Sequence, residues 1–557
     1  MSIKVLTPEV VSKIAAGEVV ERPASVVKEL IENSLDAGAT QIAIEARGGG
    51  VALIRVVDNG SGIPADEVEL AFSRHATSKI ESVSDLDSIS SLGFRGEALA
   101  SIAAVAEVEM LTRTAQEVAG TYLRLKGGIV IERSKKGCPQ GTTVTVRNLF
   151  RNVPARLKFL KSSATESSHI SSVVSQYSLA FPEVKFSLIM DGRMALQTPG
   201  SGDLRDALIK VYGLEAAEAM LPVKGESQVP EVSGFVSPPT LSRSSRSYLS
   251  FFVNRRWVQS RLLSRAVADA YQGLLMVGRH PIAVLNIYLP GEDIDVNVHP
   301  TKTEVRFRQE HALFAAVQKA VRAALVERTP VPLVRSQPSP TAMPPFLQGK
   351  EGFVEAPLFA QGGPAPEPAL PILRVVGQAA NTYIIAEGPD GLYLIDQHAA
   401  HERVLFEQVR AQRAQREVEV QGLLQPLTIE LTPRHEEMLK AGGEILAAYG
   451  FAIEPFGTRT YLLRAVPAVL KGEKVAEALM EVLDSLGGEQ DPKGWEEKIA
   501  ISLACHGAVR AGQVLNHEEM RNLVRQLEKA ELPRTCPHGR PTMIRFSSSQ
   551  LEKEFGR

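Results

Sequence analysis

A carboxylate at a strand end and two glycine-rich loops give the first part of the chain the residues of a nucleotide site. A run predicted to be a strand ends in Asp58, and a carboxylate there can accept a hydrogen bond from an exocyclic amine such as that of adenine. Gly60 and Gly62 follow, where backbone can approach a ligand closely. Gly93 and Gly96 stand immediately before an apolar helix, and such a loop at a helix N-terminus is a ready anion site. Neither a P-loop nor a Rossmann fingerprint is present, so the pattern predicts a different kind of nucleotide site.

A polar stripe precedes this strand. On a helix over residues 23–37, Glu29, Glu32, Asn33 and Asp36 fall together, opposite the apolar side chains. A stripe of this kind is most often a solvated helix face. The glycine-rich segments that follow favour a functional interpretation instead.

Several longer motifs resemble one ATPase superfamily in content and in order. They are ELIENSLDAGA, DNGSGI, RHATSKI, GFRGEALASI and GTTVTVRNLFRNVPARLKFL, followed by FVNRRWV and VNVHPTKTEVRF. These motifs are similar to those of gyrase, heat-shock chaperones, histidine kinases and MutL, and they specifically resemble MutL, the DNA mismatch repair family. The resemblance covers residues 1–328.

This resemblance implies ATP and Mg²⁺ as ligands and a role for each motif residue. Glu29 would be the general base that orients water on the γ-phosphate, and Asn33 would hold Mg²⁺ through an oxygen from the same helix face. Asp58 would read adenine with Thr143 behind it. The remaining nucleotide contacts that the resemblance implies are Gly60, Gly62, Thr77, Lys79 and the loop Gly93, Phe94, Arg95, Gly96, Glu97, Ala98 and Leu99.

One further residue, Lys302, would reach the γ-phosphate from a second domain. A lysine there adds a charge contact that is lost on hydrolysis, which would link the nucleotide state to the domain arrangement. Without the resemblance, this residue would be interpreted as a surface lysine after a His-Pro turn.

A second cluster of chemically useful residues lies late in the chain. His398 and Glu402 are spaced to share one helical face, and Asp396 lies just before that helix. Cys536 and His538 form a Cys-x-His pair suited to Zn²⁺, and Cys505 adds a third thiolate candidate. A lone His-x-x-x-Glu is usually plain surface, but two of only three cysteines lie beside histidines, which favours a metal site.

The same stretch resembles the endonuclease motif of MutL proteins. Asp396, His398, Glu402 and Glu407 stand in register with it, and the two cysteine segments resemble its companions. The resemblance implies Asp396 and Glu402 as catalytic residues, with Mn²⁺ and Zn²⁺ held by Asp396, His398, Glu402, Cys505, Cys536 and His538. His506 departs from the usual basic residue after the cysteine, so it is either a bystander or an extra ligand.

A short segment after this motif resembles the sliding-clamp-binding segment of the family through Gln421, Leu423, Leu424 and Pro426. An ordinary buried strand is about equally favoured by the same letters.

Two basic stretches stand out in a chain whose formal net charge is -2. Residues 147–165 hold five Lys or Arg and no acid, and residues 232–268 hold six arginines and no acid. They predict a groove for the DNA backbone, read without sequence preference, and the candidate contacts are Arg156, Arg255, Arg256 and Arg261. Solvated strand edges and domain packing are the alternative.

The elements that must position these residues are mixed helices and strands, which predicts an α+β fold of sandwich layers. A stretch with 11 of the 34 prolines and no periodicity reads as a linker. With the resemblance, the predicted domains are 1–215 (a Bergerat-type ATPase sandwich), 216–329 (an α/β transducer domain), 330–371 (a flexible linker) and 372–557 (an α/β dimerisation and endonuclease domain).

The composition excludes several classes of protein. Hydrophobic residues are 44% and charged residues 23%, so the chain is not disordered or fibrous. Three cysteines rule out a disulfide framework and favour a reducing compartment. No apolar run of 18 residues occurs, so we expect no membrane partner and a cytoplasmic, nucleoid-associated protein.

The resulting prediction is a homodimeric mismatch repair protein that binds and hydrolyses ATP, cooperates with a MutS-type mismatch sensor and nicks DNA. The main alternative is a matchmaker that recruits other nucleases and has no endonuclease activity of its own. A metallopeptidase, suggested by His398, His401 and Glu402, is disfavoured because the order matches no known zinc-peptidase motif. A chaperone-like ATPase is disfavoured by the endonuclease motif.

Overall fold

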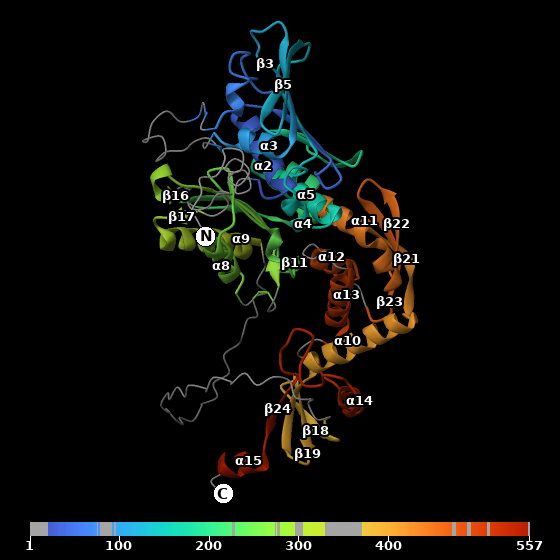
Figure 1. The fold of residues 1–557 in the computed structure, drawn as a ribbon. Coiled ribbons are helices and arrows are strands. Elements are labelled where there is room, and N and C mark those ends of the chain that lie inside the picture. The colour runs from blue at the N-terminus through green and yellow to red at the C-terminus, as the bar shows by residue number, and fades with distance from the viewer. Residues whose placement is uncertain are drawn as a thin grey trace, which may run out of the picture. The chain divides into compact units, whose positions relative to one another are not determined.

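The computed structural model divides the chain into two compact units (Figure 1). One consists of Met1–Val326 with Gln408–Gly507, and the other of Glu327–Glu407 with Ala508–Arg557. The structure describes residues 20–74, 76, 77, 79, 92, 93, 96–225, 229–272, 274, 275, 279–295, 305–328, 370–470, 475–486, 492–509 and 513–554. The predicted linker therefore lies almost entirely outside the described residues. The predicted domain limits at 215, 329 and 371 stay predictions.

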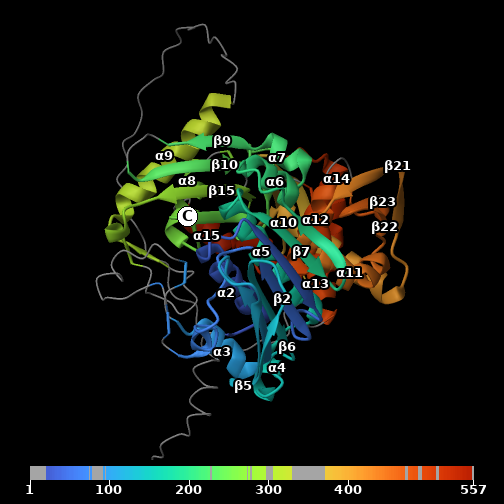
Figure 2. The same cartoon turned by 90° about the horizontal axis from the view of Figure 1, so that it is seen from above.

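An eight-stranded sheet lies in the N-terminal part of the first unit, in the order β5-β4-β3-β6-β2-β1-β7-β8. Figure 2 labels β2, β5, β6 and β7 of this sheet. All neighbours are antiparallel except β1 and β7, which are parallel. The strands are β1 (Gln41–Arg47), β2 (Leu53–Asp58), β3 (Glu107–Arg113), β4 (Gly120–Lys126), β5 (Ile129–Lys136), β6 (Gly141–Arg147), β7 (Lys185–Met190) and β8 (Arg193–Gln197).

Helices cover this sheet. Helix α2 packs on β1 and β2, α3 on β3 and β4, and α5 on β7, β8 and α2. The helices of this part are α2 (Pro23–Asp36), α3 (Ala98–Val105), α4 (Pro154–Phe159), α5 (Ser163–Ala180), α6 (Leu204–Tyr212) and α7 (Leu214–Ala219), with a 3₁₀ turn η1 at Leu70–Phe72.

Helix α2 begins and ends where the sequence predicts. Pro23 occupies its first turn, where the missing N–H costs nothing. Ala37 caps its end, and Gly38 follows with φ of +71°, a conformation that favours glycine. The predicted strands after it are β1 and β2, which pair as antiparallel neighbours across the glycine turn. The strand that ends in Asp58 therefore lies beneath the polar helix.

A second, five-stranded sheet follows, in the order β13-β12-β15-β10-β9. Its neighbours are antiparallel except β12 and β15. Its elements and their short companions are β9 (Leu221–Lys224), β10 (Glu231–Val236), β11 (Ser242–Arg243), η3 (Arg246–Tyr248), β12 (Leu249–Val253), β13 (Arg256–Val258), α8 (Arg261–Ala270), β14 (His280–Pro281), β15 (Ala283–Tyr288), η4 (Gly291–Asp293), β16 (Ile294–Asp295), β17 (Arg306–Phe307) and α9 (Glu310–Arg328). Leu263, Val267, Val317 and Val321 from the two helices share one apolar core with this sheet.

The C-terminal part is divided between the units. In the first unit it contributes a three-stranded sheet, β21-β23-β22, and three helices. These are β21 (Val420–Glu430), α11 (Pro433–Ala448), β22 (Ala452–Gly457), β23 (Thr460–Pro467), α12 (Val475–Leu486) and α13 (Pro492–Gly507).

The second unit is a four-stranded sheet, β18-β19-β20-β24, with its own apolar core. Its elements are β18 (Arg374–Ala379), β19 (Tyr383–Gly388), β20 (Gly391–Asp396), α14 (His517–Glu528), β24 (Met543–Phe546) and α15 (Ser548–Glu554). Helix α10 (Gln397–Gln415) leaves β20 directly, and its first residues, up to Glu407, belong to this unit. The predicted hairpin and the helix after it are confirmed, and so is the mixed α+β class.

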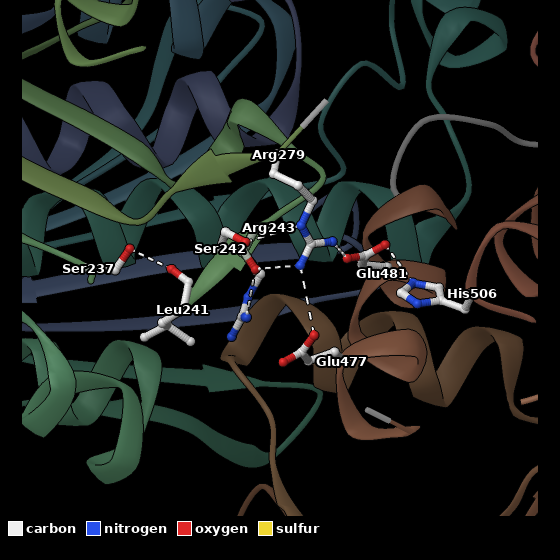
Figure 3. Close-up of polar contacts among 8 residues, drawn as sticks. All are labelled: Ser237, Leu241, Ser242, Arg243, Arg279, Glu477, Glu481 and His506. Atoms are coloured by element: carbon white, nitrogen blue, oxygen red, sulfur yellow. Dashed lines mark hydrogen bonds and ion pairs between the residues drawn. The ribbon is translucent and has the colours of Figure 1, made fainter. Parts of the chain in front are cut away.

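Polar contacts join the second sheet region of the first unit to α12 and α13 (Figure 3). The Nε of Arg279 donates to Ser242 Oγ at 3.1 Å, and its guanidinium forms ion pairs with Glu477 and Glu481. His506 Nε2 is hydrogen-bonded to Glu481 at 2.6 Å. The carboxylate of Glu481 is thus shared by Arg279 and His506.

Candidate nucleotide and metal sites

Asp58 is held in place at the end of β2 by three donors. Its Oδ1 accepts from the backbone N–H groups of Gly60 (2.9 Å) and Thr142 (3.1 Å), and its Oδ2 accepts from Ser34 Oγ (2.9 Å). Burial raises the pKa of Asp58, and these hydrogen bonds only partly offset it. Thr143, the predicted neighbour, lies on β6 and pairs with Val57 beside this carboxylate. Helix α2, β2 and β6 thus fix one acceptor in one orientation.

Asn33 and Asp36 of α2 meet Lys79. The Nζ of Lys79 lies 3.0 Å from Asn33 Oδ1 and 2.6 Å from Asp36 Oδ2. Asp36 also accepts from the backbone N–H groups of Leu92 (2.9 Å) and Gly93 (3.0 Å). The predicted Mg²⁺ ligand, the predicted lysine and the glycine loop are therefore brought together by Asp36. Sequence reasoning placed Asp36 on the polar face but gave it no role.

Two glycines of the predicted loops lie where a side chain has no room. A Cβ on Gly62 would come within 2.2 Å of the carbonyl oxygen of Arg113, and one on Gly96 within 2.6 Å of that of Ala76. Both have positive φ, +74° and +64°, so both conformation and space favour glycine. At both positions the neighbouring backbone is therefore packed directly against the glycine.

The other predicted nucleotide contacts are partly described. Thr77 Oγ1 accepts from the Lys79 N–H at 3.2 Å, so the two lie in one turn. Glu97 is the N-cap residue of α3, and Ala98 and Leu99 form its first turn. Phe94, Arg95 and Lys302 lie outside the described residues.

The polar face of α2 is not solvated. Glu32 is 1% exposed and Lys28 is 8% exposed. The Nζ of Lys28 lies 3.5 Å from Glu32 and 4.0 Å from Glu29. Tyr177, far along the chain on α5, donates its hydroxyl to Glu32 at 2.5 Å. Sequence reasoning missed Lys28 and Tyr177, because nothing local to α2 shows which side chains will cover it.

Three potential metal ligands converge in the second unit. Glu402, Cys536 and His538 each offer a ligand atom, and these atoms lie within 4.8 Å of one another. His398 is adjacent, with its Nε2 3.3 Å from Glu402 Oε1. Burial favours the neutral form of Glu402, but the contact with His398 and the nearby charges of His398 and His538 outweigh it and hold the pKa of Glu402 well below its usual range. The cluster offers one oxygen, one sulfur and one nitrogen ligand, with a second imidazole beside them.

The elements around this cluster hold it from two sides. Glu407, one turn further along α10, accepts from the backbone N–H groups of Glu531 (2.8 Å) and Leu532 (3.2 Å). The Nε of Arg403 donates to the carbonyl of Thr535, directly before Cys536. Helix α10 therefore carries Glu402 and, through Arg403 and Glu407, also holds in place the segment that contains Cys536.

The remaining predicted metal residues have different settings. Asp396 Oδ1 accepts from the N–H of Ala399 at 3.0 Å and so caps α10. It is not one of the three converging ligands. Cys505 lies on α13 in the first unit. His506 is bound to Glu481, which agrees with its being a bystander. His401 Nδ1 accepts from the Val509 N–H.

The predicted DNA contacts differ in exposure. Arg261 begins α8 and is exposed. Arg255 is half-exposed, forms an ion pair with Glu183 and lies over the ring of Phe181. Arg156 lies on α4 and is partly exposed. Arg256 is only 7% exposed, so the predicted DNA contact at this residue would need the side chain to become accessible, and it stays a prediction.

The segment that resembles a clamp-binding motif is exposed. Gln421, Leu424 and Pro426 are exposed and Leu423 is partly exposed, so the alternative of a buried strand is wrong. The pairing of β21 with β23 breaks between Gly422 and Leu427, which leaves Leu423, Leu424 and Pro426 outside the ladder, whereas Gln421 pairs with Val466.

Family models match successive parts of the chain. Residues 21–140 match the histidine kinase-, DNA gyrase B- and HSP90-like ATPase, residues 208–326 the C-terminal domain of DNA mismatch repair proteins, and residues 376–515 the MutL C-terminal dimerisation domain. The DNA mismatch repair protein MutL of Desulforudis audaxviator is 44% identical over the whole chain and 99% of its own length. The chain belongs to the MutL family of DNA mismatch repair proteins.

Another MutL, from Methanoculleus marisnigri, is 41% identical over the whole of this chain and 99% of its own length. Among solved structures, the Aquifex aeolicus MutL ATPase domain complexed with ADP is 30% identical, covers 49% of this chain and 93% of that one, and has a TM-score of 0.38. The N-terminal domain of a DNA repair protein is 26% identical, with coverage of 57% and 98% and a TM-score of 0.49.

Membership of the MutL family confirms several sequence predictions. The chain is a mismatch repair protein with an ATPase domain, which implies ATP and Mg²⁺. Its C-terminal dimerisation domain supports the predicted homodimer. In the described part of the chain, no helix is long and apolar enough to cross a membrane.

Proposed function

We propose that this MutL protein is an ATP-regulated endonuclease that nicks DNA during mismatch repair. The observation that carries the proposal is the convergence of Glu402, Cys536 and His538, with His398 beside them, in the second compact unit. These side chains come from segments more than 100 residues apart in the sequence, so their meeting is a property of the fold. A cluster of buried or half-buried acid, thiol and imidazole groups is typical of a metal site.

The proposed ATPase chemistry uses α2 and β2. Glu29 orients and deprotonates the water that attacks the γ-phosphate, and Asn33 holds the metal ion that accompanies the nucleotide. Asp58 reads the adenine amine through a carboxylate already fixed by Ser34 and Gly60. Gly60, Gly62, Thr77, Lys79, Thr143, Lys302 and residues 93–99 complete the proposed nucleotide contacts.

The residues of the second unit fit a metal ion. Among the described residues, the buried Oε2 of Glu402 finds no hydrogen-bond partner, and His538 Nδ1 lies 3.5 Å away, beyond a good hydrogen bond. An oxygen buried in this way is costly unless a cation or donor satisfies it. Cys536, His538 and Glu402 would hold Zn²⁺, with Cys505 as a proposed further ligand, and Asp396 and His398 would add hard ligands for Mn²⁺.

When bound, these ions supply the positive charge and the activated water that phosphodiester hydrolysis requires. The chain's own contribution is to orient the ligands. Asp396 fixes the first turn of α10, Glu402 presents a carboxylate kept ionised by two histidines, and Glu407 fastens the cysteine segment.

We also propose how the protein meets its partners. Exposed Arg261, half-exposed Arg255 and Arg156 would contact DNA phosphates without sequence preference. The stretch that contains Gln421, Leu423, Leu424 and Pro426 would bind a sliding clamp, since its side chains are exposed or partly exposed and its last three named residues lie outside the ladder. A MutS-type mismatch sensor would direct the protein to its site. We further propose the four-part domain division with limits at 215, 329 and 371.

One observation favours the alternative function, a matchmaker without nuclease activity. Asp396 caps a helix and lies outside the group of converging ligands. If the capping role is its only role, the metal is structural and the cut is made by another protein.

A nicking assay on supercoiled plasmid DNA with Mn²⁺ separates the two functions. Asp396→Asn keeps the size of the side chain and its ability to cap α10, but removes the charge. We expect this variant to lose nicking while keeping ATP turnover, dimerisation and Zn²⁺ content. Asp390→Asn is the matched control, because Asp390 lies in the exposed turn of the same hairpin. Full Mn²⁺-dependent nicking by Asp396→Asn would favour the matchmaker.

A further inference from the structure

Two adjacent arginines at the start of β13 have opposite surroundings. The side chain of Arg255 is half-exposed and pairs with Glu183 on the surface. Arg256 is 7% exposed, although its ladder partner Val253 and its strand place it in the second sheet. Strand β13 packs against α5, a helix of the first sheet region. Arg256 is therefore a buried arginine of the second sheet, on the strand that packs against α5.

The charge of Arg256 acts on Tyr177 of α5. Burial, the negative charge of Glu32 and the hydrogen bond to Glu32 raise the pKa of Tyr177 well above its usual value, and Arg256 is the cation that opposes this rise. Tyr177 is 2% exposed and donates to Glu32 at 2.5 Å, a short and charge-assisted hydrogen bond. Arg256 thus lies on the strand that packs against the helix carrying this donor.

Glu32 in turn shares Lys28 with Glu29. The Nζ of Lys28 lies 3.5 Å from Glu32 and 4.0 Å from Glu29, and both Lys28 and Glu32 are buried. A buried carboxylate between a lysine and a tyrosine is a charged network whose members depend on one another. If the Tyr177 hydroxyl is removed, the Glu32 carboxylate loses a donor, and its contact with Lys28 becomes the more important one. The Lys28 ammonium then shifts relative to the Glu29 carboxylate.

We propose that Arg256 and Tyr177 are positioning residues for ATP hydrolysis, which act through Glu32 and Lys28 on the proposed base Glu29. The second sheet region thereby influences the hydrolytic step through side chains of α5 and α2, none of which contacts the nucleotide. This inference rests on the proposed role of Glu29. It predicts that packing of β13 on α5 sets the rate of hydrolysis without setting the affinity for ATP.

Steady-state ATPase kinetics of the full chain test this path. In Tyr177→Phe we expect kcat to fall about tenfold while KM for ATP stays within about twofold, because the network acts on the base and not on nucleotide contacts. Arg256→Gln should give the same split. Tyr271→Phe is the matched control: Tyr271 is also 2% exposed and also loses one buried hydrogen bond, to the carbonyl of Ser237, but it lies away from the charged network. Its kcat should stay at the wild-type value.

A double variant shows whether the path runs through Glu29. Tyr177→Phe should cost nothing further in a Glu29→Gln background, since residues that act as one unit are not additive. A full extra loss there, or wild-type kcat in Tyr177→Phe beside a slow Glu29→Gln, would overturn the inference alone. Wild-type turnover in Glu29→Gln would instead overturn the proposed base. Equal thermal melting of Tyr177→Phe and Tyr271→Phe shows that any kcat difference is not a loss of folded protein.

Discussion

The nucleotide site and the metal site both combine a helix with a neighbouring segment, but they are assembled differently. At the nucleotide site, Asn33 and Asp36 lie in the last turn of α2 and Asp58 ends β2, and α2 packs on β2 with only β1 between them in the sequence. At the metal site, Glu402 from α10 meets Cys536 and His538 from a turn near the chain end. The nucleotide site therefore lies within one helix-on-sheet core. The metal site depends on the contacts between α10 and the segment around residues 531–538.

The largest effect should come from the helix of the nucleotide site. Glu29→Ala should still bind ATP but hydrolyse it 10²–10⁴-fold more slowly, because that is the range a positioned general base contributes. Asn33→Ala should lose Mg²⁺-nucleotide binding instead. Single-turnover kinetics and nucleotide titrations measure the two effects, with Glu21→Ala, an exposed acid just before α2, as control. Wild-type ATP turnover in Glu29→Ala would show that Glu29 is not the general base.

The layered core around the nucleotide site should also be sensitive to acid. Burial lowers the pKa of His169, on α5, to about 4. Because the unfolded chain takes up this proton near pH 6.5, the free energy of unfolding should fall as the pH drops from about 6.5 to about 4, by on the order of 3 kcal/mol. Below pH 4 this contribution should change no further.

Denaturant unfolding at several pH values measures this contribution. His169→Gln should show a flatter pH dependence over that window, whereas His311→Gln, exposed on α9, should behave as wild type. An unchanged slope in His169→Gln would show that this histidine titrates alike in both states.

Metal binding should weaken when the contacts between α10 and the segment before Cys536 are removed. Glu407→Ala removes the acceptor for the Glu531 and Leu532 N–H groups without touching the three converging ligands. We expect a 10–100-fold loss of Zn²⁺ affinity, the usual range for a residue that orients metal ligands. Competition with a chromophoric chelator measures it, with Glu552→Ala, exposed on α15, as control. Unchanged affinity would mean that the cysteine turn is positioned without Glu407.

The smallest effect concerns DNA. Arg261→Glu should lower the salt dependence of DNA binding by about one to two units of the log–log slope, because each phosphate contact contributes about 0.9. Affinity should fall alike on all sequences. Arg193→Glu, exposed on β8, serves as the charge-matched control. Equal slopes in both variants would place the DNA groove elsewhere.

Local sequence patterns were enough for α2, β1, β2 and the β19–β20 hairpin, since each depends on nearby periodicity, glycines and caps. The roles of the nucleotide-site residues came from the family resemblance and stay predictions. Local patterns were not enough for the surroundings of α2. Whether Glu32 is solvated depends on Tyr177, which is 145 residues away. The adjacent Arg255 and Arg256 have nearly the same local sequence, and only the packing of β13 on α5 buries one of them.

The metal residues were found from residue type and from resemblance, but their grouping was not. The sequence offered Asp396 and Glu402 as equivalent acids on one motif. In the structure Asp396 closes a helix end while Glu402 faces the thiol and the imidazole. Which of the two carboxylates faces Cys536 and His538 depends on the long-range contact between α10 and the segment before Cys536. The spacing of residues along the sequence does not reveal this contact.

The contact of Lys79 with Asn33 and Asp36 ties the turn at Lys79 to the end of α2. The same Asp36 carboxylate accepts from the backbone N–H groups of Leu92 and Gly93. One side chain therefore anchors both the turn at Lys79 and the glycine loop, so a change at Asp36 should loosen both segments at once.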